Sequence, residues 1–169
     1  YHQQVIAANI DTVFIVCGLD ADFNPRRIER YLLLVGGGGS EPVVVLTKAD
    51  QTEYSEDALA VLEELEMQGI ALHASNGLDD DSVSVLEPWL GRGRTLGLVG
   101  SCGAGKSTLL GVLAGDVLPT AGKVVIGGAD VTRNQTASRS RRVARVFQDP
   151  LAGSCGALTI EENLALAAS

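Results

Sequence analysis

The stretch of sequence that decides the fold is Gly100-Ser101-Cys102-Gly103-Ala104-Gly105-Lys106-Ser107-Thr108. It fits the pattern G-x-x-x-x-G-K-[ST], in which the N–H groups of a glycine-rich turn converge on phosphate oxygens. An apolar run at 95–99 precedes this loop, and a helical pattern at 106–114 follows it. A glycine-rich turn without a ligand is the alternative, but strand, loop and helix occur in the order that phosphate binding requires. Every residue of the stretch is therefore predicted to bind phosphate, and the Ser107 hydroxyl is predicted to be a Mg²⁺ ligand.

Upstream of this loop, short apolar runs alternate with helical patterns. Strands are predicted at 12–17, 42–46, 70–74 and 95–99. These runs are continuously apolar, which is typical of strands buried on both faces of a parallel sheet. The sequence thus predicts an α/β fold of the P-loop NTPase type, with a mainly parallel sheet and flanking helices.

Helices are predicted between these strands. Asn24 and Pro25 form an N-cap and first-turn pair for a helix that ends at the glycines 36–39. Ser55 is predicted to cap a second helix, whose inward stripe is Ala58, Val61, Leu62 and Leu65. A third helix is predicted from about Asp80 to Leu90.

The chain beyond residue 115 has a different pattern. The segment 123–126, then Gly127-Gly128, and later the segment 142–147 are predicted to form extended or hairpin structure. The polar segment 132–140 between them is predicted to be a loop. We therefore divide the chain into a nucleotide-binding domain at 1–115 and an extension at 116–169.

A second motif, Thr47-Lys48-Ala49-Asp50, directly follows the second predicted strand. Open parallel sheets bind ligands at the carboxyl ends of their strands. The Asp50 carboxylate can accept hydrogen bonds from N1–H and N2–H₂ of guanine, a donor pair that adenine lacks. The stem of Lys48 can lie along the base. After the third strand, Ser75 and Asn76 can close the other side of the base, so Thr47, Lys48, Asp50, Ser75 and Asn76 are the predicted guanine site.

Charge and cysteine content restrict the other classes of function. The net charge is −8, yet the segment 131–147 has no acidic residue and carries Arg133, Arg139, Arg141, Arg142 and Arg145. These arginines are interpreted as a solvated surface or as a docking patch for RNA or a partner. The three cysteines have no zinc-ligand spacing, so zinc is not expected. No apolar run is long enough for a transmembrane segment, and the cytoplasm is the expected location.

The first part of the chain resembles a known family. The stretches that carry the likeness are Asp11-Thr12-Val13-Phe14-Ile15-Val16, Asp22-Phe23-Asn24, Arg26-Arg27-Ile28-Glu29-Arg30-Tyr31-Leu32 and Val43-Val44-Val45-Leu46-Thr47-Lys48-Ala49-Asp50. They resemble the circularly permuted GTPases that mature the small ribosomal subunit, in which the guanine-reading strands precede the P-loop strand. The resemblance implies GTP or GDP with Mg²⁺ as ligands and the small ribosomal subunit with its rRNA as partner. By the same resemblance Asp50 and Lys48 would read guanine, Ser75 would support it, and Lys106 and Ser107 would serve phosphate and Mg²⁺.

The chain after the loop resembles a different family. Leu109-Leu110, Pro119-Thr120-Ala121-Gly122-Lys123-Val124, Arg145-Val146-Phe147-Gln148-Asp149-Pro150 and Leu158-Thr159-Ile160-Glu161-Glu162-Asn163-Leu164 are similar to ATP-binding subunits of ABC transporters. This resemblance makes Gln148 a second candidate Mg²⁺ ligand. It also leaves an alternative open, an ATP- or ADP-binding fragment that docks on a transporter membrane subunit.

A third hypothesis is a module that binds nucleotide without turnover. No Asp-x-x-Gly follows the loop, and no apolar run ending in Asp-Glu is present. Such residues hold Mg²⁺ and orient water in phosphoryl transfer. No catalytic residue is therefore assigned, and hydrolysis by this chain is expected to be weak.

Overall fold

A computed structural model describes residues 8–20, 23–48, 56–75, 84–101, 103–120, 122–144 and 155–168. Its centre is a four-stranded parallel sheet with the order β3-β2-β1-β4. The strands are β1 (Thr12–Gly18), β2 (Glu41–Thr47), β3 (Ala71–Ser75) and β4 (Leu96–Gly100). The predicted parallel α/β fold is confirmed, and each predicted strand lies within one residue of its observed position.

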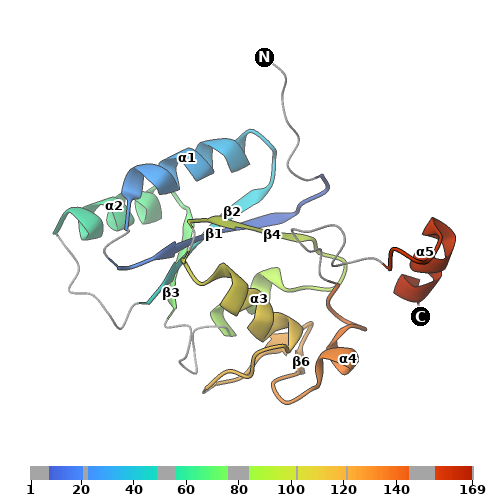
Figure 1. Cartoon of the computed structure of the whole chain (residues 1–169). Coiled ribbons are helices and arrows are strands. Elements are labelled where there is room, and N and C mark those ends of the chain that lie inside the picture. The colour runs from blue at the N-terminus through green and yellow to red at the C-terminus, as the bar shows by residue number, and fades with distance from the viewer. Residues whose placement is uncertain are drawn as a thin grey trace.

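Helices cover both faces of this sheet, which gives three layers (Figure 1). The helices α1 (Pro25–Gly36) and α2 (Glu56–Met67) pack on one face, where Ile15, Val44, Ile28 and Leu62 share a buried cluster. The 3-10 helix η2 (Ser84–Trp89) and the helix α3 (Lys106–Ala114) pack on the other. Alternate residues of the same strands, such as Phe14 and Val45, meet Leu86 and Val112 there. Both faces of β1 and β2 are therefore buried, which explains their continuous apolar sequences.

The ends of α1 are the ones that its sequence predicts. The Asn24 side chain accepts a hydrogen bond from Arg27 N at 3.3 Å, and Pro25 occupies the first turn. At the other end, the Gly37 N–H donates to the Leu33 carbonyl at 3.3 Å. The glycine run therefore ends the helix.

The predicted third helix is partly wrong. Instead of an α-helix to Leu90, the described residues form the 3-10 helix η2, which contains Pro88. Proline has no N–H to donate and its ring clashes with a preceding carbonyl, so an α-helical turn is disfavoured there. Residues 80–83 lie outside the described ranges, as does the predicted cap Ser55.

The C-terminal part contains the predicted hairpin. The strands β5 (Val125–Ile126) and β6 (Ala129–Asp130) pair across Gly127-Gly128. The hairpin thus forms directly at the glycine pair, whereas residues 142–144 belong to no strand and residues 145–147 lie outside the described residues. A short helix, α4 (Thr136–Arg139), interrupts the predicted loop. Val124 and Val131 belong to the buried cluster that contains Phe14. The division of the chain into two parts at residue 115 stays a prediction.

Arg139 is a buried cation, contrary to the surface role predicted for the arginine segment. Its side chain is 1% exposed. Its guanidinium donates to the carbonyls of Val112, Leu113, Thr132 and Asn134. Burial lowers the pKa of Arg139, an effect that the carboxylate of Asp130 opposes. The hydrogen bonds of Arg139 thus connect the segment after β6 to the last turn of α3. Carbonyl groups there have no donor within the helix and attract a cation.

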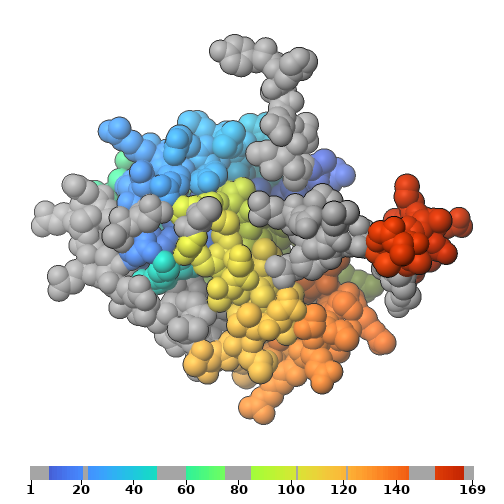
Figure 2. Space-filling model, in the orientation of Figure 1, coloured from blue at the N-terminus to red at the C-terminus, as the bar shows by residue number. Residues whose placement is uncertain are grey.

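The last helix, α5 (Ile160–Ala168), was not predicted. Figure 2 shows it in red, projecting from one side of the molecule. Thr159 and Glu162 form a reciprocal cap: Thr159 N donates to Glu162 Oε2 at 2.8 Å, and Glu162 N donates to Thr159 Oγ1 at 3.3 Å. The spacing T-x-x-E is a helix-start signal that sequence reasoning overlooked. Among the helices within the described ranges, none has the length and apolar character to span a bilayer.

Candidate nucleotide-binding site

The candidate site lies where the carboxyl ends of the parallel strands meet. Gly100 at the end of β4 pairs with Val16, and Thr47 at the end of β2 pairs with both Gly18 and Ser75. The sheet therefore brings the loop after β4 and the Thr47–Lys48 segment to the same edge, beside Ser75. Lys106, the first residue of α3, begins the helix directly after the loop.

The backbone of the loop requires glycine at its first position. Gly100 has φ +151°, and a Cβ built there would lie 2.1 Å from the Val16 carbonyl oxygen. Gly103 and Gly105 have φ values of +82° and +84°, the left-handed region that side chains disfavour. The chain can therefore turn from the strand into α3 only because these positions lack a side chain.

Lys106 folds back over the loop. Its Nζ donates to the Gly100 carbonyl at 2.8 Å and to the Ser101 carbonyl at 2.5 Å. These contacts hold the ammonium beside the N-terminus of α3, whose own N–H groups attract anions. Ser107 and Thr108 in the first turn are exposed, so their hydroxyls are accessible to a ligand. The arrangement suits a phosphate chain, although the phosphate-binding roles stay predictions, and Cys102 lies outside the described residues.

Thr47 links the two candidate segments. It is 7% exposed, and its hydroxyl donates to the Ala104 carbonyl in the glycine loop at 2.8 Å. The same hydroxyl lies 3.3 Å from the Cys17 carbonyl. Sequence reasoning predicted a guanine contact for Thr47; the structure gives its hydroxyl a partner in the phosphate loop, and a contact with the base stays a prediction.

Lys48 has a partner that sequence reasoning missed. Its Nζ forms an ion pair with the Asp20 carboxylate, from the segment after β1. Lys48 also adopts the left-handed backbone region, with φ +59°. No sequence signal marks this pair, because register between strands cannot be read from residue spacing. The other predicted guanine contacts, Asp50 and Asn76, lie outside the described residues, as does the candidate metal ligand Gln148.

Ser107 fits a Mg²⁺ ion bound together with a nucleotide. The described ranges contain no group of three His, Cys, Asp or Glu side chains that could hold a metal on its own. Mg²⁺ commonly takes one or two protein ligands and completes its octahedron with phosphate oxygens and water. The exposed hydroxyl of Ser107, next to Lys106, is accessible for such a ligand, and its role at Mg²⁺ stays a prediction.

A parallel sheet with a glycine loop between β4 and α3 defines a P-loop NTPase-like protein. Its candidate base-reading segment comes before the loop in the sequence, as in a circularly permuted protein. The chain belongs to the RsgA GTPase family, whose model matches residues 1–142.

Two relatives agree with this assignment, and a solved structure has a similar fold. Small ribosomal subunit biogenesis GTPase RsgA of Xanthomonas campestris pv. campestris (strain B100) is 82% identical over 115 residues, which cover 68% of this chain and 32% of the relative. The protein of the same name from Xanthomonas euvesicatoria pv. vesicatoria (strain 85-10) is 81% identical over the same shares. The crystal structure of YloQ, a circularly permuted GTPase, matches with a TM-score of 0.54 and 22% identity, over 86% of this chain and 54% of that chain. The chain thus spans about a third of the length of these curated relatives.

The comparisons give no support to the ABC-transporter resemblance. The GTPase family model extends through residue 142, well beyond the glycine loop. Motifs such as Leu109-Leu110 and Pro119 to Val124 therefore lie inside the region that this family already accounts for. Transporter and ATP-binding functions are accordingly not favoured.

Proposed function

We propose that this chain binds GDP and GTP with Mg²⁺, as the nucleotide-binding part of a GTPase that acts in maturation of the small ribosomal subunit. The observation that carries the proposal is the Thr47–Ala104 hydrogen bond, which ties the candidate base-reading segment to the phosphate loop. Membership of the RsgA GTPase family supports guanine as the base. The named relatives support the small ribosomal subunit with its rRNA as partner, and with it a cytoplasmic location.

In this proposal each segment has one task. The loop N–H groups and the N-terminus of α3 bind the phosphates, and Lys106 exchanges its loop carbonyls for β and γ oxygens. Ser107, together with the nucleotide, would hold a Mg²⁺ ion, which would supply positive charge to the phosphates. Asp50 accepts from the guanine edge, while Lys48 lies along the ring and Ser75 and Asn76 close its far side. Turnover is expected to be slow, because the sequence lacks an Asp-x-x-Gly after the loop.

Exposed arginines offer one surface for RNA. Arg133, Arg141 and Arg142 are exposed on the segment after β6, whereas Arg139 is buried and cannot contribute. Binding of phosphate backbones by such side chains would be sensitive to salt. The docking role of these three arginines remains part of the proposal.

Calorimetric titration with Mg²⁺ tests the base preference. GDP is expected to bind at least ~10-fold more tightly than ADP, because only guanine offers two hydrogen-bond donors to Asp50. A tenfold ratio corresponds to about 1.4 kcal/mol of binding free energy. Asp50→Asn is expected to reduce the ratio of GDP affinity to ADP affinity, because the NH₂ group of asparagine would face an N–H donor of guanine. Equal affinity for GDP and ADP in the wild-type protein would refute the proposed base.

A further inference from the structure

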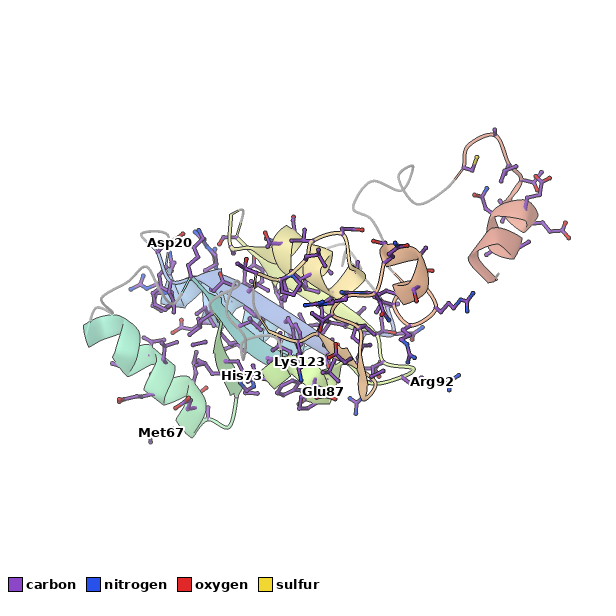
Figure 3. The ribbon with its side chains drawn as sticks, turned by 90° about the horizontal axis from the view of Figure 1, so that it is seen from below. Asp20, Met67, His73, Glu87, Arg92 and Lys123 are labelled. Carbon is purple, nitrogen blue, oxygen red and sulfur yellow. The ribbon has the colours of Figure 1, made fainter. Side chains whose placement is uncertain are left out.

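The carboxyl ends of β1 and β2 place Asp20 and Lys48 side by side. Pairing continues one residue beyond the strands, because Leu19 N donates to the Thr47 carbonyl at 2.8 Å. Asp20 and Lys48 are the next residues on the two segments, and their side chains form the ion pair described above. Figure 3 shows Asp20 at the end of the sheet opposite to Arg92. The pair thus lies at the edge where the candidate site is built.

Both the main chain and the carboxylate of Asp20 have contacts at this edge of the sheet. The Asp20 carbonyl accepts a hydrogen bond from Phe23 N at 2.9 Å. Gly18 leaves room for the side chain, since a Cβ at Gly18 would lie 3.2 Å from Asp20 Oδ2. Asp20 and Lys48 side chains are 28% and 34% exposed, so the charge pair is only partly screened by water. A charge-assisted hydrogen bond in such a place restricts both side chains.

Two properties of a lysine side chain would keep its stem from lying along a base. Its ammonium is attracted by phosphates, and its flexible stem has many rotamers. A carboxylate that binds the ammonium removes both possibilities, because it keeps the charge away from the phosphates and holds the stem in one direction. The methylene groups of that stem then offer a fixed apolar surface.

We propose that Asp20 is a positioning residue for base recognition: its carboxylate holds Lys48 Nζ so that the stem of Lys48 lies along the bound guanine. This inference rests on the proposed function, because it assigns a new residue to the same site. Asp20 is proposed to affect base recognition through Lys48, without contacting the nucleotide.

The test compares a nucleotide with a ligand that has no base. Dissociation constants for GDP and for pyrophosphate, each with Mg²⁺, are measured for wild type, Asp20→Asn, Asp20→Glu, Lys48→Met and the Asp20→Asn/Lys48→Met double variant. Glu63→Gln, an exposed position on α2, controls for loss of one negative charge. Thermal melting of each variant checks the fold.

Asp20→Asn is expected to weaken GDP binding about 5-fold, which is about 1 kcal/mol, but not to weaken pyrophosphate binding, which the released Lys48 ammonium can only strengthen. Asp20→Glu is expected to restore much of the GDP affinity, and Asp20→Asn is expected to have no further effect in the Lys48→Met background. Equal weakening of GDP and pyrophosphate would show a merely structural role and overturn the inference. So would an unchanged GDP affinity, or the same loss with and without Lys48. Failure of the proposed function would appear separately, as weak or absent GDP binding by the wild-type protein.

Discussion

Lys106→Ala is expected to weaken binding of GDP with Mg²⁺ by up to about 100-fold, while the melting temperature stays near that of wild type. A charge-assisted contact to phosphate contributes about 1.5–3 kcal/mol, and the upper value corresponds to that ratio. The fold should tolerate the change, because the carbonyls of Gly100 and Ser101 that Lys106 now binds can accept water at this partly exposed edge.

The matched control for this variant is Lys123→Ala. Lys123 is exposed and lies before β5, not in the loop. Lys123→Ala therefore removes the same charge as Lys106→Ala without changing a residue of the site. Titration calorimetry and thermal melting are run on both variants. GDP affinity of Lys106→Ala equal to that of Lys123→Ala would mean that the loop does not bind phosphate.

Arg139→Met is expected to lower the free energy of unfolding by about 3 kcal/mol or more. The substitution keeps most of the side-chain volume but removes the donors of four carbonyls, among them Val112 and Leu113 at the end of α3. Each buried carbonyl left without a partner costs about 1–3 kcal/mol, and water can satisfy some of them. Arg139→Lys is expected to recover only part of the loss, since one ammonium cannot copy the planar geometry of a guanidinium.

Urea unfolding of Arg139→Met and Arg141→Met makes the comparison. Arg141 is exposed two residues away, so its loss should change stability by less than about 0.5 kcal/mol. Similar midpoints for the two variants, with similar slopes, would show that the Arg139 contacts do not stabilise the fold.

Local sequence signals predicted most of the sheet and its helices. The apolar runs of β1 and β2 are buried on both faces, so their pattern depends little on distant contacts. Asn24 with Pro25 set the start of α1, and the glycine loop leads into α3 at Lys106, the predicted first residue of that helix. For both helices, the residues that set the start of the helix lie within one turn of that start.

The errors have two sources, one local signal that was overlooked and two contacts that distant segments decide. Pro88 replaced an apolar helical pattern with a 3-10 helix, which a stricter reading of proline would have anticipated. Burial of Arg139 depends on the last turn of α3, which lies more than twenty residues earlier. The Asp20–Lys48 pair depends on the register of β1 and β2. None of these contacts leaves a mark in local composition or periodicity.

The central claim is that a guanine nucleotide binds through the loop from Gly100 to Thr108. Amide chemical shifts of the ¹⁵N-labelled protein, recorded with Mg²⁺ and increasing GDP or ADP, test it most directly. GDP should shift the signals of Gly103, Gly105 and Lys106 together with those of Thr47 and Lys48, and saturate at a lower concentration than ADP. Saturating GDP that leaves the loop signals in place, or that shifts only signals far from this edge of the sheet, would contradict the account.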